Sequence, residues 1–207
     1  MGRHIGPKCR LCRREGVQLF LRGERCLGAK CALQKRSKPP GVHSWRRGKP
    51  SDYAVRLREK QKCKRFYGVW ERQFRRYFDM ASRAKGNTGE NLLSILERRL
   101  DNVLTVGGFG VSRAASRQVI GHGHIKVNGR KVSIASYLVN EGDVIRPSGK
   151  ENIMDMVRAT REALGNPMPT WLELNDTDTS IKVMRFPNRE EVSLEVQEQL
   201  IVEICSR

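Results

Sequence analysis

Residues 112–132 read SRAASRQVIGHGHIKVNGRKV and contain the signals for a short helix followed by a hairpin. Ser112 is a good helix N-cap and Gly121 is a good C-terminal stop, so a helix is expected between them. Two short strands are then expected within residues 124–132. They are joined by Asn128-Gly129, a dipeptide that tolerates the positive φ angles of a tight turn. The stretch therefore predicts a small unit of mixed helix and strand.

Apolar periodicity on both sides of this stretch predicts the other elements. Helices are expected over about residues 51–62, 69–83, 88–107, 152–164 and 194–204, and further strands over 142–146, 171–174 and 181–186. One apolar stripe of the second helix is expected in the core and consists of Trp70, Phe74, Tyr77, Phe78 and Ala81. The whole pattern predicts an α+β fold with a short, mostly antiparallel sheet.

Positive charge is concentrated at the beginning of the chain. The sequence has 40 Lys and Arg residues against 22 Asp and Glu residues, a formal net charge of +18. The first 85 residues contain 25 basic and 6 acidic side chains, whereas residues 151–207 contain 6 and 11. Such an excess favours a polyanionic partner. Nucleic acid fits better than a membrane surface, which would call for a basic helix with a broad apolar face.

Four cysteines form two pairs near the N-terminus. Two residues separate Cys9 from Cys12, four separate Cys26 from Cys31, and thirteen separate the pairs. Each pair can present two thiolates to one ion, and four thiolates make the closed tetrahedral site typical of structural Zn²⁺. An iron–sulfur cluster and four unrelated thiols are the alternatives.

Several motifs occur in the order found in a known RNA-binding module. They are RLDN at 99–102, GGFGVSR at 107–113, ASRQVIGHGHIKVNG at 115–129 and EGDVI at 141–145. This block resembles the small RNA-binding domain named after the fourth protein of the small ribosomal subunit. The four-cysteine N-terminus, SDY at 51–53, ERQFR at 71–75, KGNTGENLL at 85–93 and PTWLE at 169–173 are similar to the rest of the bacterial-type ribosomal family. The resemblance covers essentially the whole chain.

The resemblance implies a structural component of the small ribosomal subunit and no enzyme. It implies a primary binder of small-subunit ribosomal RNA that nucleates subunit assembly, holds a junction of RNA helices and contributes to translational accuracy. Neighbouring ribosomal proteins are expected partners, and messenger RNA is a candidate partner where it enters the ribosome. Neither a membrane nor a small-molecule substrate is implied. A cytoplasmic, ribosome-bound location follows.

Three regions are expected on the same basis. Residues 1–50 would form a basic zinc-knuckle segment and linker, and residues 51–97 a small helical domain completed by residues 188–207. Residues 98–187 would form an inserted RNA-binding α/β module with its sheet extension.

The expected RNA-binding residues are spread over several elements, because folded RNA is recognised largely through shape, phosphates and 2′-hydroxyls. Before the module they are Arg3, Lys8, Arg10, Arg13, Arg14, Arg56, Arg58, Lys60, Lys62, Arg72 and Arg76. In the module they are Arg113, Arg117, His122, His124, Lys126, Asn128 and Arg130, along one concave edge. A solvated charged face without a ligand is the alternative for this edge. In the Pro- and Gly-rich linker, Arg46, Arg47 and Lys49 are expected to contact messenger RNA.

Two other classes of protein share parts of this pattern. Pseudouridine synthases carry the same kind of module and use an aspartate in an Arg-Leu-Asp context, which residues 99–101 match. Their catalytic domain follows the module, and the chain has no room for it. Asp101 is therefore expected at a helix surface or end, in a local salt bridge. A zinc-knuckle transcription regulator is the second class, but a compact DNA-reading helix and a dimer seam are missing from the sequence.

Overall fold

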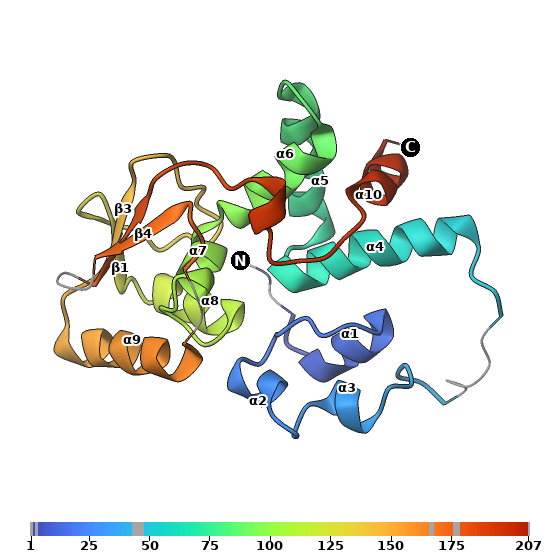
Figure 1. The fold of residues 1–207 in the computed structure, drawn as a ribbon, viewed down its shortest axis with the longest axis horizontal. Helices are drawn as coiled ribbons and strands as arrows, with labels where there is room; N and C mark the ends of the chain where they lie inside the picture. The colour runs from blue at the N-terminus through green and yellow to red at the C-terminus, as the bar shows by residue number, and fades with distance from the viewer. Residues whose placement is uncertain (1, 3, 43–47, 166–167, 176–178, 207) are drawn as a thin grey trace. The chain divides into compact units, whose positions relative to one another are not determined.

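The computed structural model describes residues 2, 4–42, 48–165, 168–175 and 179–206. The described residues form helices and a five-stranded sheet, which confirms the expected α+β class (Figure 1). The chain divides into two compact units. Unit 1 comprises residues 1–92 and 193–207, and unit 2 comprises residues 93–192. The finer division into residues 1–50, 51–97 and 98–187 stays a prediction.

Unit 1 begins with three short helices, which are α1 (Lys8–Glu15), α2 (Glu24–Leu27) and α3 (Ala32–Lys35). α1 ends at Gly16, whose φ of 74° lets its N–H donate to the carbonyl oxygen of Cys12. The Glu15 side chain is almost fully buried and forms ion pairs with Arg58, at 3.3 Å, and with Arg65. Both arginines belong to α4 (Asp52–Tyr67), so a buried charge fixes α1 against α4.

α4 begins where it is predicted, because the Ser51 hydroxyl accepts a hydrogen bond from Ala54 N at 3.3 Å. It extends beyond the predicted end to Gly68, where a φ of 63° stops it. α10 (Glu198–Cys205) packs along α4. An ion pair between Arg56 and Glu203 joins the two helices at their exposed edge.

α5 (Glu71–Arg83) carries the predicted apolar stripe with one correction. Phe74, Tyr77, Phe78 and Ala81 are buried, but the side chain of Trp70 is 52% exposed. Trp70 is the N-cap residue and has extended backbone angles, so its side chain does not follow the helical periodicity. The prediction of a core position is wrong for Trp70.

The single helix predicted over residues 88–107 is wrong, since the chain forms α6 (Thr88–Glu97) and α7 (Leu100–Val106). Leu100 N and Asp101 N donate to the carbonyl oxygens of Tyr137 and Ala135, at 2.8 and 3.2 Å. In return, Val139 N donates to the carbonyl oxygen of Arg98 at 3.0 Å. A distant segment therefore satisfies the backbone groups at the break and starts α7 in a new direction.

Unit 2 contains the predicted helix and hairpin, which are α8 (Arg113–Gly121), β1 (Ile125–Val127) and β2 (Arg130–Lys131). Its other elements are β3 (Val144–Pro147), α9 (Glu151–Leu164), β4 (Leu172–Asn175), β5 (Ser180–Val183) and the 3₁₀ turn η1 (Arg189–Glu191). The strand order is β2-β1-β3-β5-β4, and the paired strands are antiparallel. Asn128 and Gly129 have φ angles of 49° and 79°, as the turn dipeptide predicts.

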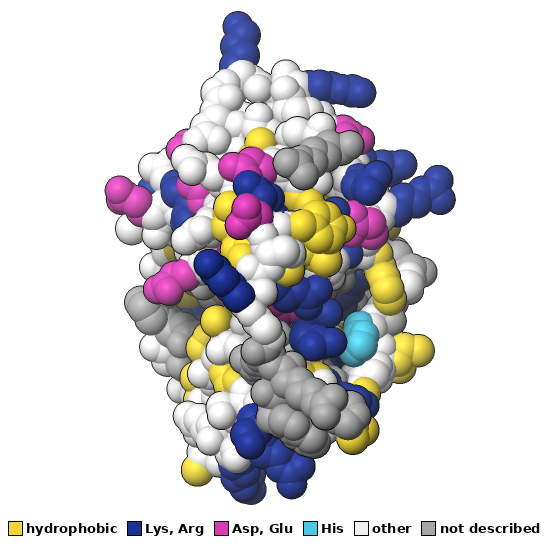
Figure 2. Space-filling view, turned by 90° about the vertical axis from the view of Figure 1, so that its right-hand side faces the viewer, with side chains coloured by type: hydrophobic (Ala, Val, Ile, Leu, Met, Phe, Trp, Pro, Cys, Tyr) yellow, Lys and Arg dark blue, Asp and Glu magenta, His cyan; other side chains and the backbone are white. Residues whose placement is uncertain are grey.

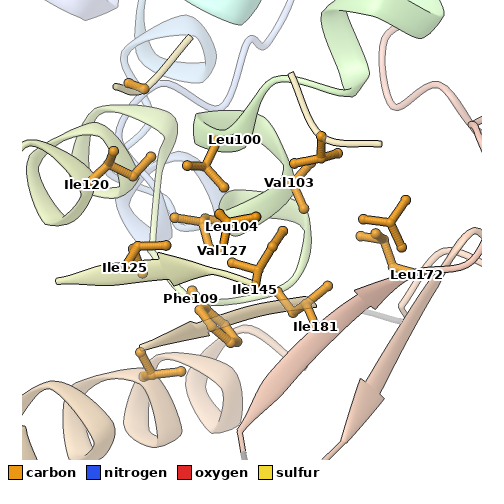
Figure 3. Packing of buried hydrophobic residues seen from close by; sticks show 14 of the residues in the cluster. Leu100, Val103, Leu104, Phe109, Ile120, Ile125, Val127, Ile145, Leu172 and Ile181 are labelled. Atoms are coloured by element: carbon orange, nitrogen blue, oxygen red, sulfur yellow. The ribbon is translucent and has the colours of Figure 1, made fainter. Parts of the chain in front are cut away.

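The core of unit 2 is formed by α7, α8, α9 and one face of the sheet. Figure 3 shows Leu100 and Leu104 of α7 and Ile120 of α8 gathered above Ile125 and Ile145 of the strands. Burying each such side chain contributes roughly 1.5–3 kcal/mol. Because side chains alternate along a strand, the residues between the buried ones lie on the opposite face of the sheet.

Candidate nucleic-acid interface

A buried carboxylate at the start of α7 holds an arginine of α8. Asp101 is fully buried and accepts two hydrogen bonds from Arg99, Nε at 3.0 Å and Nη2 at 2.7 Å. It also accepts one from Nη1 of Arg117 at 3.1 Å. The predicted local salt bridge is thus confirmed, and of the two predicted positions Asp101 takes the helix end, where it is buried. The carboxylate fixes where the Arg117 guanidinium lies on α8.

The second arginine of α8 is held in a similar way. Nε of Arg113 donates to Oδ1 of Asn102 at 2.8 Å, and Nδ2 of Asn102 donates to the carbonyl oxygen of Glu97 at 3.1 Å. Asn102 also donates to the buried Glu97 carboxylate. The motif RLDN at 99–102 therefore supplies, in Asp101 and Asn102, one partner for each of the two arginines.

The corner His122-Gly123-His124 connects α8 to β1. The two imidazole rings meet edge to face, with centroids 5.9 Å apart. Gly123 has a φ of 71°, and a Cβ at this position would lie 1.9 Å from Cε of Lys131. This positive φ favours glycine, and any side chain here would also displace the end of the Lys131 side chain.

The hairpin places its predicted residues in two different environments. Lys126 and Arg130 are exposed. Asn128, in contrast, donates from Nδ2 to Oδ1 of Asp143 at 2.8 Å and accepts from Val144 N at 2.9 Å. Its side-chain amide joins the hairpin to the start of β3. Asn128 therefore has a structural role in addition to the predicted role in RNA binding.

The predicted residues of α4 are mostly engaged in ion pairs within unit 1. Lys60 is buried and pairs with Glu71, while Lys62 pairs with Glu59 at 2.8 Å. Arg56 and Arg58 form the ion pairs with Glu203 and Glu15 described above. On α5, by contrast, Arg72 and Arg76 are exposed.

One group of ion pairs centres on Glu71. Nζ of Lys64 lies 2.6 Å from its carboxylate, and Nε of Arg75 lies 3.3 Å from it. Burial alone would raise the pKa of Glu71, but hydrogen bonds from Lys60 and Lys64 outweigh burial and lower the pKa to about 2. Glu71 therefore stays ionised and neutralises the lysines around it.

The remaining predicted cations lie in the N-terminal part of unit 1. Nζ of Lys8 donates to the carbonyl oxygen of Leu21 at 3.3 Å, and Nε of Arg13 to that of Lys38 at 2.9 Å. Exposed positions are taken by Arg10, Arg14 and Lys49. Arg3, Arg46 and Arg47 lie outside the described residues. On the face drawn in Figure 2, Lys and Arg side chains project from the surface with acidic side chains among them.

The four N-terminal cysteines line one small cavity. Cys12, Cys26 and Cys31 are buried and Cys9 is half-buried. The cavity has a volume of about 10 Å³, and Gln18, Arg22 and Arg25 also line it. Burial raises the pKa of the Cys12 and Cys26 thiols, and the neighbouring thiols raise both further. Within the described part of the chain, no set of three or more His, Cys, Asp or Glu side chains is arranged to hold a metal ion.

Comparison with known proteins covers the whole chain. Residues 3–97 match the model of the ribosomal protein S4/S9 N-terminal domain, and residues 98–145 match that of the S4 domain. The chain is 55% identical over 209 residues to small ribosomal subunit protein uS4A of Symbiobacterium thermophilum. It is 52% identical over 209 residues to uS4 of Thermus thermophilus and 53% identical over 210 residues to uS4 of Thermodesulfovibrio yellowstonii. Each alignment covers 100% of both chains.

The chain belongs to the uS4 family. The S4 domain match spans α7, α8 and the hairpin, which are the elements that carry Arg113, Arg117 and Lys126. Among the described helices of this uS4-family chain, none is long and apolar enough to span a membrane.

Sequence reasoning missed three basic residues on the solvent face of the uS4 sheet. Lys131 and Arg146 lie directly opposite Lys126 on the two neighbouring strands, and Lys182 lies on the next strand. The sequence does predict that these side chains face solvent, since basic residues alternate with apolar ones in Ile125-Lys126-Val127 and in Ile145-Arg146-Pro147. The order of the strands, however, cannot be inferred from the sequence pattern, so the pattern does not show that these cations lie on neighbouring strands.

Proposed function

We propose that this uS4-family chain is a structural, ribosomal RNA-binding component of the small ribosomal subunit. Its relatives are named small ribosomal subunit proteins over their full length. The single observation that carries the proposal within the structure is the pair Arg113 and Arg117, held on one face of α8 by Asn102 and Asp101. An arginine held in this way loses little side-chain entropy when it binds a phosphate.

The proposed RNA-binding residues of the module are Arg113, Arg117, His122, His124, Lys126, Asn128 and Arg130. The module presents two arginines on α8, then two imidazoles at the corner, then two exposed cations on the hairpin. This series of groups is suited to binding a phosphate backbone. In unit 1, the exposed Arg10, Arg14, Arg72 and Arg76 fit the same role. The predicted residues of α4 fit it less well, because their charges are already matched by carboxylates.

We further propose the roles that the family resemblance implies. The protein would be a primary binder of small-subunit ribosomal RNA that nucleates assembly and contributes to translational accuracy beside neighbouring ribosomal proteins. Arg46, Arg47 and Lys49 would contact messenger RNA on its way into the ribosome. A ribosomal role also places the chain in the cytoplasm and makes it structural rather than enzymatic.

A binding titration tests the proposal. The chain is titrated with folded small-subunit ribosomal RNA at several salt concentrations, with an equal length of duplex DNA as competitor. We expect tight RNA binding that resists the competitor and a steep negative slope of log affinity against log salt. Equal competition by the duplex would mean that charge alone drives binding, and a DNA-binding regulator would then be the better interpretation.

We also propose that Cys9, Cys12, Cys26 and Cys31 bind one structural Zn²⁺. Four thiols around a single cavity are the donor set of a closed zinc site, in which the metal links chain segments and takes no part in catalysis. A cavity of about 10 Å³ is near the size of one water-sized sphere, which favours a single ion over an iron–sulfur cluster. Arg22 and Arg25, which line the same cavity, would offset the negative charge of four thiolates.

A further inference from the structure

The solvent face of the sheet in unit 2 carries a row of three cations. Lys126 of β1 is directly opposite Lys131 of β2 on one side and Arg146 of β3 on the other. All three side chains are exposed, whereas the adjacent Val127 and Ile145 are buried in the core. Residues directly opposite each other in antiparallel strands share a face, with Cβ atoms roughly 4.5–5.5 Å apart.

The row continues onto a fourth strand. Lys182 of β5 pairs with Val144 of β3, so it is diagonal to Arg146 on the same face. Beyond it, Glu173 of β4 is opposite Lys182 and adds one acidic side chain to this surface. Arg146, Glu173 and Lys182 line an open hollow of about 370 Å³. We call Lys131, Lys126, Arg146 and Lys182 the basic row.

Like charges directly opposite each other destabilise a sheet. Lys126 has such a neighbour on both sides, and among the strand partners of these four residues in the described part of the sheet, Glu173 opposite Lys182 is acidic. Lys131 also lies across Gly123, which brings one end of the row to the corner that carries His122 and His124. Cations placed opposite one another in this way fit a surface that is neutralised by a bound polyanion.

We infer that the basic row is a second RNA-binding surface, on which a phosphate backbone crosses the strands from the hairpin toward the hollow beside Arg146 and Lys182. This inference rests on the proposed function and extends its site from one edge of the module across the sheet. The arrangement supports a backbone rather than a single anion, because four neighbouring strands, roughly 4.8 Å apart, each contribute one cation. An acidic protein segment is the competing ligand, and the experiment separates the two.

The test measures affinity for folded small-subunit ribosomal RNA at several salt concentrations for the full chain and its variants. The triple variant K131Q/R146Q/K182Q leaves Lys126 and both arginines of α8 in place. Each lost phosphate contact lowers the steepness of the log–log salt slope by about 0.9, so we expect a decrease of about 2 to 3. The charge-preserving variant K131R/R146K/K182R should keep the wild-type slope.

A matched control uses single substitutions of one exposed arginine each. R146Q should lower the slope by about 1, whereas R158Q, on the outside of α9, should leave it unchanged. If the wild-type chain binds the RNA and the triple variant keeps its slope, the inference is wrong, the proposed function stands, and an acidic protein partner takes precedence. If the wild-type chain does not prefer the RNA to duplex DNA, the proposed function fails and the inference fails with it.

Discussion

The Asp101 carboxylate serves two guanidinium groups, one buried and one at the candidate interface. Replacing it by Asn removes the charge that Arg99 and Arg117 share, and Arg99 is left buried at 2% exposure. Breaking a buried pair from one side usually costs roughly 3–5 kcal/mol. We therefore expect Asp101→Asn to lower the free energy of unfolding by about that amount in urea titrations, and to weaken RNA binding through Arg117.

The same chemical change at an exposed pair provides the control. Asp155 lies 3.7 Å from Arg158, and both side chains are at least 60% exposed. Asp155→Asn should change the free energy of unfolding by less than about 1 kcal/mol. Equal effects of the two substitutions would show that the buried network around Asp101 contributes little.

Gly123 of the corner and Gly121 at the end of α8 predict opposite effects of one added methyl group. Gly123→Ala places an L-residue at a left-handed φ of 71°, so it should lower the free energy of unfolding by roughly 1–3 kcal/mol, while the end of the Lys131 side chain moves aside. A Cβ at Gly121 meets open space within the last turn of α8, and Gly121→Ala should be neutral or stabilising by about 0.4–1 kcal/mol. Thermal unfolding measures both, and a stabilised Gly123→Ala variant would contradict the argument.

The sequence predicted an element well where the interaction that starts or turns it is made between residues close together in the chain. Ser112 caps α8 and Asn128-Gly129 turns the hairpin, and both interactions are made within a few residues of the chain. The break between α6 and α7 was not predictable, because it depends on hydrogen bonds with residues 135–139, far along the chain. The apolar pattern continues across the break, since both helices face the interior.

The contact between α4 and α5 predicts a dependence of stability on pH. The pKa of Glu71 is lowered to about 2 from an ordinary 4.5. A carboxylate with a lowered pKa stabilises the folded state above the ordinary value, and this stability is lost as the pH falls toward the folded-state pKa. The wild-type free energy of unfolding should therefore fall between about pH 4.5 and pH 2, and Glu71→Gln should flatten that fall.

Denaturant titrations at half-unit pH steps measure the effect. At neutral pH, Glu71→Gln should also be destabilised, since Lys60 is buried and loses its partner. The exposed Glu195 gives the matched substitution, and Glu195→Gln should follow the wild-type pH dependence. If the free energy of unfolding fell equally with pH in wild type and in Glu71→Gln, the loss of stability in acid would not come from the ion pairs of Glu71.

At the scale of the whole molecule, charge predicted the kind of partner better than it predicted the individual contacts. The 25 basic residues of the first 85 indicated a polyanion, but Lys60 and Arg58 are matched by internal carboxylates. Residue type does not tell a cation that binds RNA from one that holds two helices together, because that depends on which glutamates the fold brings close. The basic row could not be predicted either, because the fold decides which strands are neighbours and therefore which cations lie side by side.

The proposed Zn²⁺ site would couple metal binding to the folding of the N-terminal segment. Among the described residues up to 42, the buried apolar side chains are Leu19 and three of the cysteines, so a bound ion would supply much of the stability of this segment. We expect one Zn²⁺ per chain by elemental analysis and, after exchange, the visible absorption of Co²⁺ in a tetrahedral thiolate site. Cys26→Ser should abolish both signals. Cys63→Ser, at a buried thiol of α4 outside the cavity, should keep both, even if it lowers stability.

Removing the metal with a chelator should increase hydrogen exchange in residues 1–42, while the amides of α8 and the sheet stay protected. Wild-type protein purified without bound metal, and unable to take up Zn²⁺ or Co²⁺ after reduction, would show that the four thiols are packed as an ordinary small core.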